Sequence, residues 1–221
     1  MNKGEFIILF LFYLCSGLSI LSGIYLLSLN INTRLHKIAF LFCASLSCWC
    51  FGVAQSLQAE TLSEALSWRR IAVIGACFFY GFFIHFLIVI TNNKTFQKNI
   101  MLVVIYGPVF LLTYFCALNE KYATEIYKFQ KTDIGWVSTI SSQKWYYAFE
   151  ITIVCYFVFG LFLVFQWKKD RKSKENQIQL KIIFYTYVIS LAFAILVQFF
   201  LKQGISANNL WKNTLFLGSK P

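Results

Sequence analysis

The chain has 221 residues, of which 58% are hydrophobic and 13% are charged, and its formal net charge is +11. Soluble domains carry roughly 45–50% apolar and 25% charged residues, so this composition excludes a water-soluble protein with an ordinary core. The basic excess does not indicate nucleic-acid binding, because no segment outside the apolar stretches is large enough to gather the basic residues on one solvated module.

Six apolar stretches occupy most of the sequence, and each is long enough to cross a bilayer. A span needs about 20 predominantly apolar residues to cross roughly 30 Å of hydrocarbon, where a helix satisfies its own backbone. The predicted spans are residues 6–29, 38–58, 71–91, 100–118, 147–167 and 182–201. A further apolar segment, 210–217, is too short to cross. We therefore predict an all-α fold, a polytopic transmembrane helix bundle with six spans and an incomplete seventh, forming one domain over residues 1–221.

The basic residues of the short connections predict the orientation. Cytoplasmic loops carry an excess of Lys and Arg, and the connection 168–181 holds six such residues against two acidic ones. Placing it inside also places 34–37 and 94–98 inside. The connection 59–70 and the long segment 119–146 then face outward, together with the N-terminus. We predict a multi-pass protein of the cytoplasmic membrane with its N-terminus outside.

All seven cysteines fall inside predicted spans. A disulfide framework would be placed in outer loops, so we expect free thiols. Cys48 and Cys50 are two residues apart and point to different sides of a helix, so they cannot hold one metal ion together. We expect neither a metal nor another cofactor. The sequence also lacks phosphate-loop and hydrolase motifs, so we do not expect this stretch to be an enzyme.

Ionisable and amide side chains inside spans are costly, so each is a candidate for a functional site. In the predicted orientation several of them lie at one level in the outer half of the spans. They are Gln55, Gln58, Glu150, Gln198, Arg69 and Arg70. We expect an arginine of this group to pair with the glutamate across helices, and we hypothesise a polar ligand-binding cavity that opens to the outside. The alternative is that near-surface Gln and Glu side chains reach water or satisfy helix ends.

Aromatic residues gather in and after the long outer segment, at Trp136, Trp145, Tyr146 and Tyr147. A belt of aromatic rings at the membrane interface is one interpretation. The other is a stacking wall for an amphipathic or aromatic ligand, in which Trp145 belongs to the ligand-binding site.

His85 lies in the inner half of the third predicted span. No second ionisable residue is expected at its depth, so a proton relay or metal site would lack partners. We expect its imidazole to form a hydrogen bond with a neighbouring helix.

Small residues recur every four positions in the second span, at Ala44, Cys48, Gly52 and Ser56. In lipid the association of helices rests on packing, and small side chains let two backbones approach closely. The stripe therefore predicts a packing face.

Gly107 and Pro108 stand near the middle of the fourth span. Proline removes a backbone donor, so we predict a kink, which is tolerated where neighbouring groups satisfy the freed carbonyls.

Several segments together form a pattern that covers nearly the whole chain. It includes Ser-Trp-Arg-Arg-Ile at 67–71 leading to Gly75, Phe-Ile-His-Phe-Leu at 83–87 with Thr91, Trp-Tyr-Tyr at 145–147 opening the fifth helix, and Gln177, Gln179 and Lys181 before the sixth. This pattern resembles the N-terminal seven-helix membrane region of bacterial sensor histidine kinases, which also occurs ahead of diguanylate cyclase modules. The resemblance implies an input module of a two-component system that senses a signal at or within the membrane and passes it through the last helix to a cytoplasmic kinase.

The resemblance also implies binding partners, and this sequence departs from the family pattern in one respect. The partners are the lipid bilayer, an unknown small or amphipathic signal, and a cytoplasmic kinase or a second copy of the chain. The seventh helix is cut short, and no phosphoacceptor region or ATP-binding domain follows, so we expect a truncated product or a stand-alone membrane partner. Two other functions remain open, namely a small-solute permease and a structural subunit with the stripe through Gly52 as its interface.

Overall fold

The computed structural model describes residues 3–91, 96, 98–119, 121, 127–132, 135–140 and 144–170. Five helices in this part of the chain are long and apolar enough to cross a membrane. They cover Phe6–Leu29, Arg34–Gln58, Leu62–Thr91, Ile100–Leu118 and Tyr147–Trp167. The first five predicted spans are therefore confirmed as long apolar helices, and the protein is a multi-pass membrane protein. The sixth predicted span, 182–201, and the segment 210–217 lie outside the described residues.

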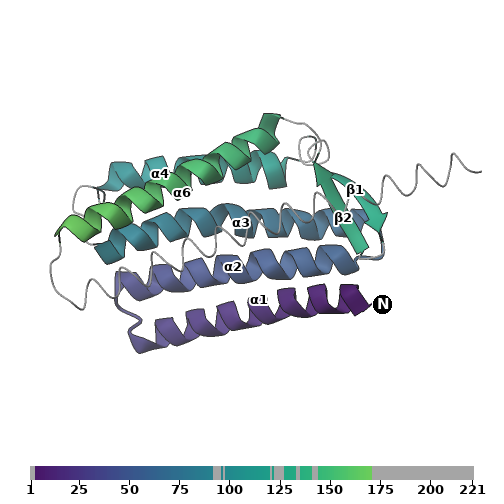
Figure 1. Ribbon diagram of the computed structural model, residues 1–221, viewed down its shortest axis with the longest axis horizontal. Coiled ribbons are helices and arrows are strands. Elements are labelled where there is room, and N and C mark those ends of the chain that lie inside the picture. The colour runs from purple at the N-terminus through teal and green to yellow at the C-terminus, as the bar shows by residue number, and fades with distance from the viewer. Residues whose placement is uncertain are drawn as a thin grey trace, which may run out of the picture. The chain divides into compact units, whose positions relative to one another are not determined.

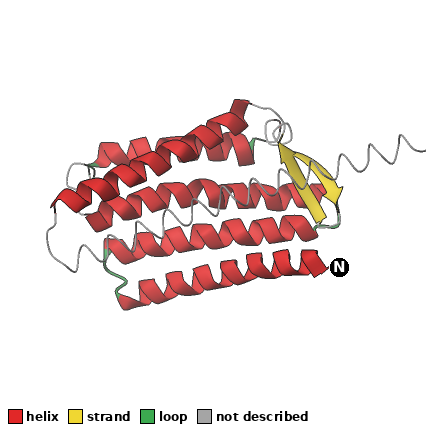
Figure 2. Ribbon diagram, in the orientation of Figure 1, coloured by secondary structure: helices red, strands yellow, loops and turns green. Residues whose placement is uncertain are grey.

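The helices follow one another through the bundle with a small sheet at one end. The elements are α1 (Lys3–Leu29), α2 (Arg34–Gln58), α3 (Leu62–Thr91), α4 (Asn99–Thr113), the π-helical turn η1 (Tyr114–Leu118), β1 (Tyr127–Thr132), β2 (Gly135–Ile140) and α6 (Lys144–Asp170). Helix α2 lies between α1 and α3, and α4 packs against α3 (Figure 1). Figure 2 shows the two strands beside the end of α2 and the start of α3.

Helix α3 begins well before the apolar run that predicts it, because a local capping arrangement fixes its start. The hydroxyl of Thr61 accepts a hydrogen bond from the backbone N–H of Glu64 at 3.2 Å. The carboxylate of Glu64 in turn accepts one from the N–H of Glu60 at 3.1 Å. The first of these bonds satisfies a donor that the first turn of a helix leaves without a partner, and the second ties the residue before Thr61 to the same turn. Arg69 and Arg70 therefore lie within α3 and not in a connection before it.

Helices α2 and α3 approach so closely that their backbones touch. A Cβ atom added at Gly52 would lie 2.7 Å from the backbone nitrogen of Ala72, and one added at Gly75 would lie 2.5 Å from that of Trp49. The hydroxyl of Ser56 donates to the Ala65 carbonyl at 3.0 Å across the same interface. The predicted small-residue stripe is thus confirmed as a packing face. Because α3 covers Gly52, the stripe does not offer an interface to another subunit, and that part of the subunit hypothesis is wrong.

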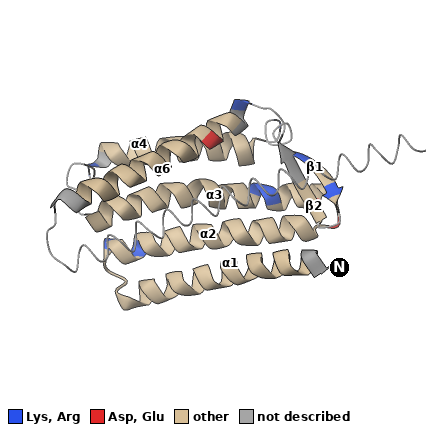
Figure 3. Ribbon diagram, in the orientation of Figure 1, with Lys and Arg blue, Asp and Glu red and all other residues tan. Residues whose placement is uncertain are grey.

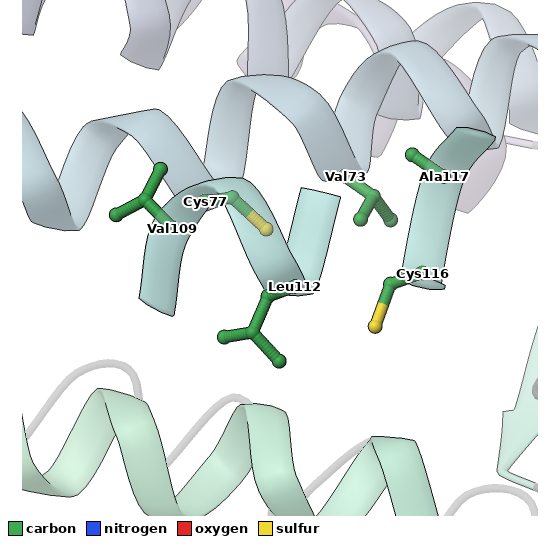
Figure 4. Packing of buried hydrophobic residues seen from close by; sticks show 6 residues of the cluster. All are labelled: Val73, Cys77, Val109, Leu112, Cys116 and Ala117. Atoms are coloured by element: carbon green, nitrogen blue, oxygen red, sulfur yellow. The ribbon is translucent and has the colours of Figure 1, made fainter. Parts of the chain in front are cut away.

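A second contact joins α3 to α4 and η1. Its buried side chains form one cluster, seen in Figure 4: Val73, Cys77, Val109, Leu112, Cys116 and Ala117. Ala148, Phe149 and Tyr156 of α6 pack against this cluster and are partly buried. The first part of α6 is thereby placed beside α3 and α4.

The remaining helix surface is strongly apolar and exposed. On α1 the side chains of Phe6, Leu18, Leu21 and Tyr25 are each more than half exposed. Contiguous apolar surface of this extent is rare on soluble monomers and suits contact with lipid tails. Figure 3 shows that the charged residues of the described helices stand toward their ends, as the cost of burying charge in hydrocarbon requires.

The long segment 119–146 contains a β-hairpin that the sequence did not lead us to predict. Strands β1 and β2 pair antiparallel, with Tyr127 opposite Ile140 and Thr132 opposite Gly135. Gly135 has a φ of +101°, and a Cβ there would lie 2.0 Å from the Leu57 carbonyl oxygen, so glycine is required twice over. The indole N–H of Trp136 donates to the Ala59 carbonyl at 2.9 Å. The hairpin therefore caps the end of α2.

Substitution of Gly75 by Ala tests the backbone contact between α2 and α3. The new Cβ would meet the Trp49 nitrogen and the Ser45 carbonyl, so the helices must separate. We expect the free energy of unfolding to fall by roughly 1–3 kcal/mol, the usual cost of overpacking. Gly17→Ala on α1 is the matched control, because no heavy atom lies within 4 Å of its added Cβ. Thermal unfolding of both variants in detergent micelles measures the difference, and equal midpoints would contradict the contact.

Candidate functional site

Two of the predicted site residues, Gln55 and Gln58, meet at a tyrosine of α1. The hydroxyl of Tyr13 donates to Oε1 of Gln58 at 2.6 Å and accepts a hydrogen bond from Nε2 of Gln55 at 3.1 Å. One turn further along, the Ser16 hydroxyl lies 2.9 Å from that of Ser47. Polar bonds thus join the first half of α1 to the second half of α2. In a bilayer such bonds add to packing as the attraction between helices.

The other described residues of the predicted site lie on α3 and α6. Arg69 and Arg70 are half-buried, and their Nε atoms are fully covered by protein. Glu150 is half-buried on α6. Trp145 stands on α6 about one turn before Glu150. The structure thus shows Gln55 meeting Gln58 through Tyr13, whereas the convergence of all these side chains on one cavity stays a prediction.

Gln198, the last residue of the predicted site, lies outside the described residues. The same is true of residues 171–181 of the basic connection 168–181, on which the predicted orientation of the chain chiefly rests. The ligand-binding site inferred from the sequence stays a prediction.

A second polar group lies toward the opposite ends of these helices. Nη2 of Arg34 is 2.9 Å from Nε2 of His85, and Nδ1 of His85 is 2.8 Å from the Tyr106 hydroxyl. His85 is buried, with 9% of its surface exposed. The expected hydrogen bond to a neighbouring helix is confirmed. The expectation that no second ionisable residue lies at its depth is wrong, because α2 begins at Arg34 and the long arginine side chain reaches along the helix into the bundle.

The chemistry of the partners fixes the state of the imidazole. A guanidinium group carries donors and no acceptor, so Nε2 of His85 accepts the hydrogen bond from Arg34. The proton of a neutral imidazole is then on Nδ1, which donates to the oxygen of Tyr106. An imidazolium, with donors on both nitrogens, could not accept from Arg34. This arrangement therefore requires neutral His85.

Helix α4 carries two irregular features in its span. Pro108 stands inside α4, and η1 follows, where the N–H of Asn119 reaches the Tyr114 carbonyl at 2.8 Å. The hydroxyl of Tyr156 on α6 donates to the Ile105 carbonyl, next to the carbonyl of residue 104 that Pro108 leaves without its usual donor. A neighbouring helix thus bonds the backbone beside the freed carbonyl, and satisfaction of the freed carbonyl itself stays a prediction. The kink itself stays a prediction.

All seven cysteines are free, and they lie on α1, α2, α3, η1 and α6. Within the described ranges no group of three or more His, Cys, Asp or Glu side chains is placed to hold a metal ion. Cys48 donates weakly to the Ile71 carbonyl at 3.7 Å, so it takes part in the contact between α2 and α3.

The sequence reasoning missed four polar participants: Tyr13, Arg34, Tyr106 and Tyr156. The three tyrosines count as apolar in a search for spans, although a buried tyrosine hydroxyl usually finds a partner. A search for tyrosines deep inside spans would have found them. Arg34 was assigned to a connection, and only the observed start of α2 brings it to His85.

Comparison with known protein families gives one match. The family model of the N-terminal 7TM region of histidine kinase matches residues 10–210. This range includes most of α1 and all the later described elements. Comparisons with curated proteins and with solved structures found no match.

Substitution of Tyr13 by Phe tests the polar group between α1 and α2. The change removes the donor to Gln58 and the acceptor of Gln55, and it keeps the ring. We expect the free energy of unfolding to fall by about 1 kcal/mol, in the range measured for hydrogen bonds between membrane helices. Tyr25→Phe, at an exposed position of the same helix, should have no effect. Equal unfolding midpoints for the two variants in lipid nanodiscs would show that the Tyr13 bonds contribute nothing.

Proposed function

Because this chain belongs to the family of N-terminal 7TM regions of histidine kinases, we propose that it is a signal-sensing input region of that kind. Residues 1–221 form one input domain in the cytoplasmic membrane, with the N-terminus outside. The resemblance inferred from the sequence is confirmed by the family match. The family is one of membrane-embedded sensor regions, so the chemistry of phosphoryl transfer belongs to a separate kinase module.

The site we propose for the signal lies in the outer half of the bundle. It takes up a small or amphipathic molecule and is lined by the residues inferred from the sequence. These are Gln55, Gln58, Glu150, Gln198, Arg69, Arg70 and Trp145. Amide, carboxylate and guanidinium groups would orient the polar part of the molecule, and the indole would cover its apolar part.

The observation that carries this proposal is the hydrogen-bonded group of Tyr13, Gln55 and Gln58. Polar side chains that bond between helices inside spans offer donors and acceptors for which a polar ligand can compete. Gln55 is half-buried and Gln58 is exposed, so the group extends from the helix interface to the surface. A ligand that bonds these amides would replace bonds that now join α1 to α2.

Such a replacement would change how the helices pack. Of the described elements, α2 makes the extensive contact with α1, and α1 exposes a largely apolar face elsewhere. Weakening the bonds of Tyr13 would therefore free α1 to shift against α2 while the close contact of α2 with α3 persists. A ligand shifts this equilibrium only as far as it binds one packing better than the other. A cytoplasmic kinase, or the second copy in a dimer, would respond to this shift of α1 against α2.

A thermal-shift screen of the chain in lipid nanodiscs tests the proposal. The panel holds small polar solutes and amphipathic molecules in parallel. A binder present at about 100 times its Kd should raise the stability of the folded state by about 2.7 kcal/mol. Uptake of the same binder into proteoliposomes that contain the chain would favour the permease. Binding without uptake agrees with a sensor, and a panel without binders contradicts the proposed site.

Substitution of Glu150 by Gln then tests the site with any binder found. The change keeps the size of the side chain and removes the negative charge, so we expect the Kd to rise by about tenfold or more when the carboxylate bonds the ligand directly. Glu60→Gln, in the turn between α2 and α3, is the matched control and should bind as the unchanged protein does. The amount of each protein in the membrane fraction checks insertion. An unaltered Kd for the Glu150 variant would remove Glu150 from the site.

A further inference from the structure

A hydrogen bond connects α6 to the backbone of α4 close to Pro108. The Tyr156 hydroxyl donates to the carbonyl oxygen of Ile105. That carbonyl belongs to the peptide that joins Ile105 to Tyr106, two residues before Pro108. A rotation of this peptide plane moves the Tyr106 backbone with it, because the peptide unit is planar. The position of Tyr156 therefore acts on Tyr106 directly.

Tyr106 continues the connection to α3 and α2. Its oxygen accepts from Nδ1 of His85, and Nε2 of His85 accepts from Arg34, the first residue of α2. In this tautomer Nδ1 donates and Nε2 accepts. If either hydrogen bond is lost, only one partner still favours the tautomer that the remaining bond requires. Bonds that share one ring in this way respond to each other more strongly than separate bonds do.

The surroundings of Tyr106 leave little room for independent movement. A Cβ added at Gly81 of α3 would lie 2.9 Å from Val109 and 3.3 Å from the Tyr106 ring. The Tyr106 ring also meets Phe82 edge-on, with centroids 5.7 Å apart. By contrast, a Cβ at Gly107 would meet no heavy atom within 4 Å. The backbone at Gly107 thus has free space beside it, while the Tyr106 side chain is packed against α3.

We propose that Tyr156, the Ile105–Tyr106 peptide unit, the Tyr106 side chain, His85 and Arg34 form one coupled series of hydrogen bonds and covalent links, the Tyr156–Arg34 network, which couples the α4 backbone beside Pro108 to the first turn of α2. A change of backbone geometry beside Pro108 is transmitted through His85 and alters how firmly Arg34 is held. This coupling goes beyond the proposed function, because it operates in the ligand-free protein and requires no signal site. It gives the bundle a conformational device that links helices α6, α4, α3 and α2.

The first test observes His85 after a change at the far end of the network. The chain is labelled with ¹⁵N-histidine in lipid nanodiscs, and His85→Gln distinguishes the signals of its two histidines. The unchanged protein should show the signals of a protonated Nδ1 and an unprotonated Nε2 at His85. Tyr156→Phe, which does not alter any atom bonded to His85, should shift both signals, whereas Tyr25→Phe should leave them in place. A protonated Nε2, or signals that ignore Tyr156→Phe, would overturn the proposal.

The second test runs in the opposite direction and does not depend on the Tyr156 variant. Arg34→Met removes the donor to His85, and hydrogen exchange of the backbone amides of α4 is measured by mass spectrometry. We expect exchange around residues 105–109 to rise by about twofold or more, the lower end of coupling between linked residues. Lys37→Met, at an exposed position of the same helix, should leave it unchanged. Equal exchange in the two variants would refute the coupling, whether or not a ligand is ever found.

Discussion

The close approach of α2 and α3 is the constraint on which the rest of the bundle depends. Lipid tails are as apolar as leucine side chains, so two helices gain little from burying apolar surface against each other in a membrane. Gly52 and Gly75 instead allow the two backbones to touch, and Ser56 adds a hydrogen bond to the Ala65 carbonyl. Any side chain at either glycine would separate the helices, so the pair has one relative position.

Both polar groups are built on this fixed pair. Gln55 and Gln58 extend from α2 to α1 near one end, and Arg34 extends from α2 to His85 of α3 near the other. Helices α1 and α4 pack against this pair from its two sides, α1 against α2 and α4 against α3. The polar bonds of α2 thus extend to α1 near one end, and near the other end they reach His85, which also bonds Tyr106 of α4.

Hydropathy predicted the helices well and the polar partners poorly, for one physical reason. A span must be apolar over its whole length, so its signal sums about 20 residues, and residues 6–29, 100–118 and 147–167 were predicted with the bounds of the apolar helices observed. A hydrogen bond depends on single side chains of different helices, which a linear pattern does not relate. The hairpin was missed although 127–132 and 135–140 are rich in strand-forming residues and separated by two residues. A hydropathy signal summed over about 20 residues does not respond to two six-residue strands.

Helix α4 shows why irregular backbone persists inside this bundle. In water, a carbonyl freed by proline bonds to solvent. In hydrocarbon it needs a protein donor, because a buried carbonyl without a hydrogen bond destabilises the helix. Tyr156 of α6 donates to the Ile105 carbonyl, next to the freed one, and the wider turn of η1 brings Cys116 and Ala117 into the cluster with α3. Both irregular segments of this helix are thus in contact with neighbouring helices. A helix whose own backbone needs its neighbours in this way responds when they move, and α4 is for that reason the element best suited to pass a change of packing onward.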